Sequence, residues 1–219
     1  MPDNHADEAG PVQPGTSGLR RRGRVPLWLK LAYTLFVCLL VPVYWRAYGP
    51  TNFLWFSDIA LLLTLAALWF ESRLLASMLA LSVLILDLAW NVDFFTRLAT
   101  GVQLTPLSRY MFNQGIPLFV RAFSLFHVML PLLLLWLVAH LGYDRRAFVA
   151  QTLLAWLILP VTYLCTNPAR NINWAFGYGP QPQTLLPAPL YVCLLMLIFP
   201  LCLYLPTHFA LKKMFGWSD

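Results

Sequence analysis

The sequence predicts an all-α polytopic membrane bundle with six transmembrane helices and both termini in the cytoplasm. Three observations lead to this prediction. Of the 219 residues, 59% are hydrophobic and only 11% are charged, whereas soluble domains carry roughly 25% charged residues. The apolar residues fall into six runs of about the length that crosses a membrane, ~20 residues. Lys and Arg are concentrated at one end of these runs, and this bias sets the expected orientation.

The six expected spans follow one another with two short and two long connections among them. The second and third runs are joined by the turn ESR, and the fourth and fifth by GYDRR, whereas the segments after the third and fifth runs are long and polar. A backbone in hydrocarbon must satisfy its own hydrogen bonds, so Leu- and Ala-rich runs of this length are expected to be helices. The expected spans are 26–46, 52–70, 74–95, 116–141, 147–165 and 187–206.

Three regions are expected along the chain. Residues 1–24 are rich in Pro, Gly and polar side chains, which predicts a disordered basic segment. The sequence RRRGR precedes the first span without a small-residue cleavage site after it, which favours an uncleaved signal anchor. Residues 25–210 form the six-helix transmembrane domain, and 211–219 form a short cytoplasmic tail.

Basic residues set the orientation. With the N-terminus inside, the outer side holds Arg46, Arg97, Arg109 and Arg170, and the inner side holds more: Arg20, Arg21, Arg22, Arg24, Arg73, Arg145, Arg146, Lys212 and Lys213. An inner excess is the pattern of cytoplasmic loops. We therefore expect a multi-pass protein of the bacterial cytoplasmic (inner) membrane.

Polar residues inside the spans gather in the expected outer half of the bundle. The inner halves hold neither acid nor base between their terminal residues. Charged side chains at this depth cost several kcal/mol unless they are paired or hydrated. We therefore expect one polar cavity open to the outside, formed by Ser57, Asp58, Asp87, Asn91, Asp93, Arg121, Ser124, His127, Thr162 and the segment TNPARNINW.

Helical spacing suggests roles within this layer. Asp87 and Asn91 are four residues apart and share a helix face, as do Ser124 and His127, which are three apart. Pro131 lacks the N–H that would bond the carbonyl of His127, so that acceptor is left free beside the imidazole. The candidate catalytic residues are Ser57, His127 and Asp87, and the candidate substrate-binding residues are Asp58, Asn91, Arg121, Ser124 and Asn171.

Each candidate also has a structural interpretation. His127 is either a general base or a neutral histidine bonded to a neighbouring helix. Ser57 is either a nucleophile or a small residue at a helix contact. Asp87 either serves the site or forms a salt bridge with Arg121, and Asp58 also favours the dipole of its helix. Asn171 either lines the site or forms a turn.

Composition excludes several other functions. The net charge of +6 comes from residues that flank apolar runs, which indicates contact with anionic lipid rather than nucleic acid. The four cysteines form no CxxC pair and no Cys/His cluster at metal spacing, so no metal or cofactor is expected. Whether Cys165 and Cys193 pair stays open. The expected partners are membrane lipids, including a lipid or fatty-acyl substrate.

Several stretches resemble YwaF-type bacterial membrane proteins and, more distantly, the androgen-induced membrane hydrolases and related acyltransferases. The resemblance rests on NFLWFSDIALLLTLAAL, SLFHVMLPLLLLWLV, TNPARNINW and LYVCLLMLIFPLCLYLP. It implies a Thr or Cys nucleophile on an early span and a histidine on a middle span, acting on fatty-acyl esters or lipids. His127 matches the histidine, whereas Ser57 stands near the place of the nucleophile and departs from both patterns.

The sequence thus favours a lipid-directed hydrolase or acyltransferase with an outward-facing Ser57–His127 site. A transporter or channel component is the main alternative, although polar residues would then be expected through the whole membrane thickness. A non-catalytic membrane partner, with the polar layer as structural glue between helices, is the third.

Overall fold

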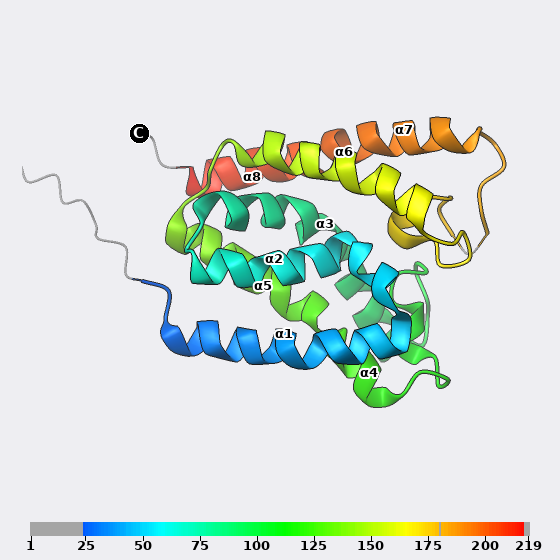
Figure 1. The fold of residues 1–219 in the computed structure, drawn as a ribbon, viewed down its shortest axis with the longest axis horizontal. Coiled ribbons are helices and arrows are strands. Elements are labelled where there is room, and N and C mark those ends of the chain that lie inside the picture. The colour runs from blue at the N-terminus through cyan, green and yellow to red at the C-terminus, as the bar shows by residue number, and fades with distance from the viewer. Residues whose placement is uncertain (1–23, 180, 217–219) are drawn as a thin grey trace, which may run out of the picture.

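The computed structural model describes residues 24–179 and 181–216, and within these ranges every regular element is a helix (Figure 1). The expected basic segment 1–24 lies outside the described residues apart from Arg24. The α-helices are α1 (Leu27–Tyr48), α2 (Phe56–Trp69), α3 (Arg73–Thr100), α4 (Leu118–Phe123), α5 (Phe126–Leu141), α6 (Ala147–Cys165), α7 (Ala188–Ile198) and α8 (Leu205–Phe215). The shorter elements are the 3-10 turns η1 (Pro50–Leu54), η2 (Arg109–Phe112) and η3 (Ile172–Trp174) and the π-helical turn η4 (Phe199–Tyr204).

Five apolar helical segments of the described chain are long enough to cross a membrane. They are Leu27–Tyr48, Arg73–Thr100, Leu118–Leu141, Ala147–Cys165 and Ala188–Phe215. The sixth apolar helix, α2, has 14 residues and measures about 21 Å at ~1.5 Å per residue, less than the ~30 Å of a hydrocarbon core. The all-α prediction is confirmed for the described residues, and the helices fit a multi-pass membrane bundle.

The helix boundaries differ from the expected spans at the second and third runs. The second run was expected to form one helix over 52–70, but its start is the 3-10 turn η1, and α2 begins only at Phe56. The third helix continues beyond the expected residue 95 to Thr100, where Gly101 ends it in the left-handed conformation with φ 77°. The second run therefore contributes a helix of only 14 residues.

The fourth and sixth runs are irregular. The fourth run divides into α4 and α5 at Ser124 and Leu125, so His127 lies in the first turn of a new helix. The sixth run continues through η4 to Phe215, so residues 211–215 of the expected tail belong to α8. Pro200 lies second in η4 and cannot donate a backbone hydrogen bond, which accounts for the change of helical register there.

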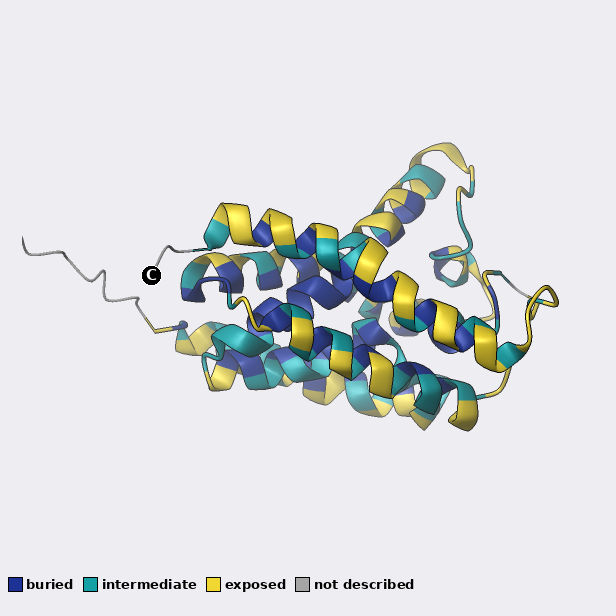
Figure 2. Cartoon of the chain, turned by 90° about the horizontal axis from the view of Figure 1, so that it is seen from above, coloured by how far each residue is buried: buried dark blue, intermediate teal, exposed yellow. Residues whose placement is uncertain are grey.

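Helix α3 occupies the centre of the bundle. It contacts α2, α5, α6, η4 and α8, and of the five long segments it is the most buried, whereas α1 is the least. Leucines from neighbouring helices fill the core, among them Leu61, Leu79 and Leu134, each fully buried. The outward faces of the helices are exposed (Figure 2) and carry large apolar side chains, as expected for a surface in contact with lipid.

The two ends of the bundle are built differently. The hairpin end has the short turns 70–72 and 142–146, and the loop end has the long segments 49–55, 101–117 and 166–187 (Figure 1). Val25 N–H donates to Glu71, and Tyr143 N–H donates to the carbonyl of Phe215. The described chain therefore enters and leaves the bundle at the hairpin end.

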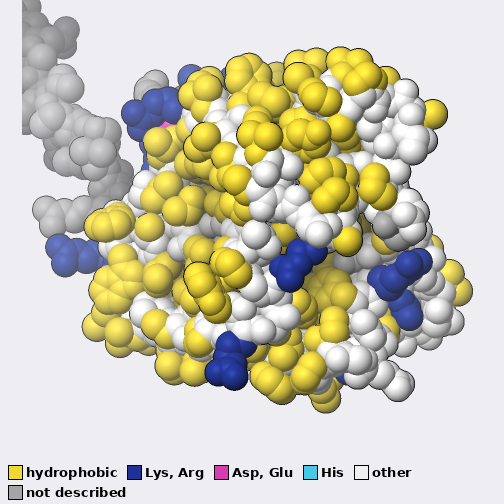
Figure 3. Space-filling model, turned by 45° about the vertical axis from the view of Figure 1, so that its right-hand side comes forward, with side chains coloured by type: hydrophobic (Ala, Val, Ile, Leu, Met, Phe, Trp, Pro, Cys, Tyr) yellow, Lys and Arg dark blue, Asp and Glu magenta, His cyan; other side chains and the backbone are white. Residues whose placement is uncertain are grey.

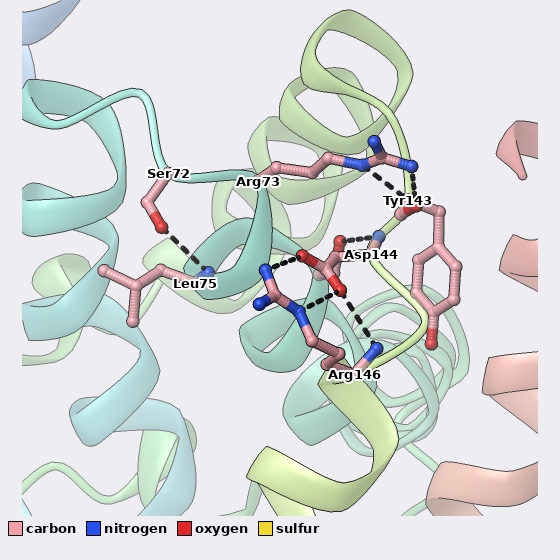
Figure 4. A network of polar contacts seen from close by, with 7 residues as sticks. Ser72, Arg73, Leu75, Tyr143, Asp144 and Arg146 are labelled. Atoms are coloured by element: carbon pink, nitrogen blue, oxygen red, sulfur yellow. Dashed lines mark hydrogen bonds and ion pairs between the residues drawn. The ribbon is translucent and has the colours of Figure 1, made fainter. Parts of the chain in front are cut away.

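A polar network joins the two turns of the hairpin end (Figure 4). The guanidinium of Arg73 donates two hydrogen bonds to the carbonyl of Tyr143, at 3.0 and 2.5 Å. The next residue, Asp144, donates its N–H to Ser77 Oγ at 2.9 Å, and its carboxylate accepts from Arg146. The network fixes the α5–α6 connection against the start of α3.

Asp144 gives this end of the bundle a defined pH dependence. The hydrogen bond from Arg146 holds the pKa of the Asp144 carboxyl below its ordinary value. A lowered pKa stabilises the fold at neutral pH, and the stabilisation is lost as the pH falls through the folded-state pKa. We expect Asp144→Asn to lower the unfolding temperature at pH 7 by about 1–3 °C, a small effect because Arg146 is exposed. In detergent, this difference in unfolding temperature should become smaller as the pH is lowered from 7 towards the folded-state pKa. An equal difference at all pH values would contradict the ionic role.

Candidate functional site

A cavity of about 390 Å³ lies at the loop end of the bundle. Side chains of α1, α2, α3 and α5 form its walls together with the loop segments after η1, α3 and α6. Eight of its lining residues are aromatic. Of the eight predicted site residues, six line this cavity: Ser57, Asp58, Asp87, Ser124, His127 and Asn171. Asn91 and Arg121 lie outside the wall.

The central contact of the cavity joins α3 to α5. His127 Nδ1 lies 2.9 Å from Asp87 Oδ1, and the two side chains are only 13% and 3% exposed. Trp90 and Phe126 stack against the imidazole, with ring centroids 4.8 and 4.2 Å away. A carboxylate on Nδ1 fixes the ring orientation and favours the tautomer that carries its proton there. This leaves Nε2, which makes no hydrogen bond within the described residues, as the nitrogen available to the cavity.

Asn91 supports this pair from behind the cavity wall. Its Nδ2 donates to the carbonyls of His127 and Asp87, at 2.8 and 2.7 Å. The carbonyl of His127 is the acceptor that Pro131 leaves without a helical partner. Asn91 therefore satisfies the group that the proline frees, and it connects the backbones of the two residues in the Asp87–His127 pair.

Ser57 lies at the start of α2 and is partly exposed to the cavity. The N–H groups of Ser57 and Asp58 donate no hydrogen bond within the described residues, as expected in the first turn of a helix without a capping side chain. Such N–H groups, at the positive end of a helix dipole, favour negative charge. No hydrogen bond joins Ser57 to His127 in the described part of the chain.

Asn173 holds the turn that presents Ser57. This side chain is 2% exposed. Its Oδ1 accepts from Phe56 N–H at 3.0 Å, and its Nδ2 donates to the carbonyl of Leu54 at 2.7 Å and to Thr162 Oγ1 at 3.3 Å. One amide from the segment after α6 thus connects η1, α2 and α6. In the sequence, only the polar composition of the segment TNPARNINW indicates that Asn173 could have such a role.

Two carboxylate oxygens at the cavity have no partner in the described residues. Asp58 accepts one hydrogen bond at Oδ2, from Asn52 at 3.3 Å, and its Oδ1 is buried and unpaired. Asp87 uses Oδ1 for His127, and its Oδ2 is likewise buried and unpaired. Unsatisfied buried carboxylate oxygens are costly, so each requires a physical explanation.

Arg121 does not occupy its expected place. It forms no ion pair with Asp58, Asp87 or Asp93 in the described residues, and its guanidinium instead donates to the carbonyl of Met111 at 2.6 Å. Helix α4 ends two residues after Arg121, before the chain turns into α5. This break turns Arg121 away from the acids that helical continuity would have placed beside it.

The arginines that line the cavity are Arg109 and Arg170. Each of the two side chains lines the cavity and is also exposed on the surface, so both lie at the opening of the cavity. The Arg170 side chain donates to the carbonyl of Tyr48 and to Thr51 Oγ1, whereas the guanidinium of Arg109 makes no hydrogen bond within the described ranges. In the view of Figure 3, which brings the loop end forward, basic side chains stand apart on a largely apolar face. Arg170 belongs to the segment TNPARNINW, which is expected at the cavity, whereas the sequence indicates only an orienting role for Arg109.

Three other polar residues of the expected layer have structural partners. Ser124 Oγ lies 2.6 Å from Tyr44 OH, which joins the α4–α5 break to α1. Asn171 lines the cavity and also closes its own loop, since it donates to the carbonyls of Gly177 and Gly179. For Asn171, the turn-forming interpretation and the interpretation as a cavity-lining residue therefore both apply.

Asp93 accepts hydrogen bonds from the segment 103–108, including those from the N–H and Oγ of Ser108.

The described residues contain no group of three His, Cys, Asp or Glu side chains arranged to hold a metal ion. The four cysteines are free thiols, so Cys165 and Cys193 are not paired. Comparison of the chain with protein-family models, curated proteins and solved structures gives no match in any of the three.

Proposed function

We propose that this chain is a lipid-directed ester hydrolase or acyltransferase that uses Ser57 as nucleophile and His127 as general base. The single observation that carries the proposal is the Asp87–His127 pair, whose remaining ring nitrogen is available to a cavity that Ser57 also lines. A carboxylate that orients an imidazole beside a hydroxyl is the arrangement that activates serine in many unrelated hydrolases.

The proposed reaction has two steps. In the first, His127 Nε2 takes the proton of Ser57 Oγ as that oxygen attacks the ester carbonyl carbon. The resulting oxyanion accepts from the free N–H groups of Ser57 and Asp58. The C–O bond to the alcohol then breaks, and His127 returns the proton to that alcohol. In the second step, water or another alcohol attacks the acyl-serine and releases a free acid or a new ester.

Bound substrate must bring Ser57 and His127 within hydrogen-bond distance. Such contacts are often long in enzymes without substrate and shorten when the complex forms. Ser57 lies in the first turn of α2, and His127 lies in the first turn of α5, next to a helix break. Both positions permit small movements more readily than the middle of a long helix does.

The membrane arrangement supports access by lipid. We propose six spans, with α2 as the short one, and both termini in the cytoplasm of a bacterial cell. The loop end would then face outward, and the shortness of α2 would place Ser57 below the membrane surface, within reach of a lipid ester. The acids inside the described helices, Asp58, Asp87 and Asp93, all lie toward the loop end, which favours an enclosed site over a transport path.

The resemblance to YwaF-type proteins and androgen-induced hydrolases agrees with this proposal at His127. The nucleophile differs, because a serine stands where the resemblance implies Thr or Cys. Serine needs a stronger base than a thiol does, and the buried Asp87 would supply it by stabilising the imidazolium that forms at His127.

Ester turnover by purified protein in lipid nanodiscs tests the proposal. With a fluorogenic fatty-acyl ester, we expect Ser57→Ala to lower the turnover rate at least about 10³-fold. Ser108→Ala is the matched control, since Ser108 is a buried serine of the loop end that bonds Asp93. Turnover by Ser57→Ala at the parental rate would rule out the assigned nucleophile, and absence of ester turnover in the parent would argue against the function.

A further inference from the structure

One buried carboxyl group of the cavity, Asp58, has no positively charged partner among the described residues. The ion pairs of the described residues are Lys30–Glu71, His127–Asp87 and Arg146–Asp144, so Asp58 has none. Asp58 is only 4% exposed, and its Oδ1 is buried without a partner. A buried carboxylate of this kind is stabilised when a cation occupies the space in front of it.

The surroundings of Asp58 fit an ammonium group better than a metal ion. Eight aromatic side chains line the cavity, among them Tyr48, Trp55, Trp174 and Tyr110. Aromatic faces attract organic cations within about 6 Å of the ring centroid. The described side chains offer no metal-binding group of three ligands, whereas one carboxylate among aromatic rings is sufficient for an amine.

The position of Asp58 next to Ser57 locates this ammonium relative to the reacting ester. Neighbouring Cα atoms are ~3.8 Å apart, and both residues line the cavity. A cation held by Asp58 would therefore lie close to the carbonyl that Ser57 attacks. An α-amino acid ester has this arrangement, because its ammonium is attached to the carbon next to the carbonyl.

The opening of the cavity suits a negatively charged group attached to the alcohol side of such an ester. Arg109 and Arg170 line the cavity and are exposed, and the guanidinium of Arg109 makes no hydrogen bond to another described residue. Guanidinium groups at this place suit the phosphate of a lipid headgroup at the membrane surface. The cavity, about 390 Å³, is within the ~300–1,000 Å³ usual for small ligands.

We propose that the substrate is an aminoacyl ester of an anionic phospholipid, whose α-ammonium binds Asp58 and whose phosphate binds Arg109 and Arg170. The inference rests on the proposed function for the reaction at Ser57, whereas recognition of the ammonium by Asp58 does not depend on it. Attack by Ser57 Oγ would form an aminoacyl-serine and release the lipid alcohol, with the proton passing through His127. Water would then release the free amino acid.

Two matched lipids test the charge requirement: alanyl-phosphatidylglycerol and its N-acetyl derivative, which has the same ester without the positive charge. In nanodiscs, we expect the parent to release alanine at least about tenfold faster than N-acetylalanine. Asp58→Asn should remove this preference mainly by slowing the charged ester. Equal rates for the two lipids in the parent, or an unchanged preference in Asp58→Asn, would overturn the proposal. The comparison within the parent stands even if the variant fails to fold.

Binding to Ser57→Ala separates this inference from the catalytic proposal. Native mass spectrometry of that variant should show alanyl-phosphatidylglycerol bound at least about tenfold more tightly than the N-acetyl lipid. The same result with an inactive parent would retain the ammonium site and refute catalysis by Ser57. Equally tight, Asp58-dependent binding of phosphatidylethanolamine would place the ammonium on the alcohol side and overturn the aminoacyl assignment.

Discussion

Replacement of His127 by glutamine is expected to lower the rate of Ser57 acylation by about 10²–10⁴-fold, the usual contribution of a general base. Glutamine keeps a polar side chain of similar length at this position but cannot accept the serine proton. Stopped-flow measurement of the acyl-enzyme burst in nanodiscs gives this rate directly. His140→Gln is the matched control, since His140 lies near the hairpin end of the same helix, stacked on Trp136.

The same experiment separates catalysis from structure. Asp87→Asn should also slow acylation, because an amide at this place permits the wrong tautomer and no longer stabilises the imidazolium. If His127 serves only to join α3 to α5, both variants should lose thermal stability and retain the burst rate per folded molecule. That outcome would contradict the role of the pair as base and orienting acid.

Replacement of Asn173 by alanine is expected to have the second large effect. The substitution leaves Phe56 N–H, the Leu54 carbonyl and Thr162 Oγ1 without their amide partner. Since each buried group left unsatisfied costs ~1–3 kcal/mol, we expect a loss of about 2–4 kcal/mol in unfolding free energy. We also expect slower acylation, because the turn before Ser57 loses the buried side-chain hydrogen bonds that hold Leu54 and Phe56 to the segment after α6.

Unfolding in denaturant and the burst rate should be measured on the same samples of Asn173→Ala. Asn167→Ala is the control, because Asn167 is exposed and its side chain accepts only the local N–H of Ala169. It should change neither quantity appreciably. A fully stable Asn173→Ala protein would show that the three hydrogen bonds contribute little, and it would remove the structural basis assigned to the turn.

The features that depend on composition and periodicity were predictable from the sequence. Apolar run length predicted the helices, and 147–165 coincides with α6. The spacing of Asp87, Asn91 and His127 on two helices, with Pro131 four residues further on, predicted a free carbonyl, and Asn91 bonds that carbonyl. These predictions held because they require only helical geometry.

The features that depend on breaks in helices were not predictable. The division between α4 and α5 at Ser124 directs Arg121 to Met111, whereas an unbroken helix would have kept it near the acids. Arg109 lies in the segment between helices, for which the sequence has no periodicity to interpret. The hydrogen bonds of Asn173 to Phe56 and Leu54 span over a hundred residues of chain, and composition alone cannot specify such a pairing.

The most direct test of the account is to locate the residue that a fluorophosphonate modifies. After reaction of the purified protein in nanodiscs, peptide mass spectrometry identifies the side chain that carries the phosphonate. We predict a single adduct on Ser57 that is absent from His127→Gln and present in His140→Gln. An adduct on another residue, or one on Ser57 that forms equally fast without His127, would contradict the proposed site.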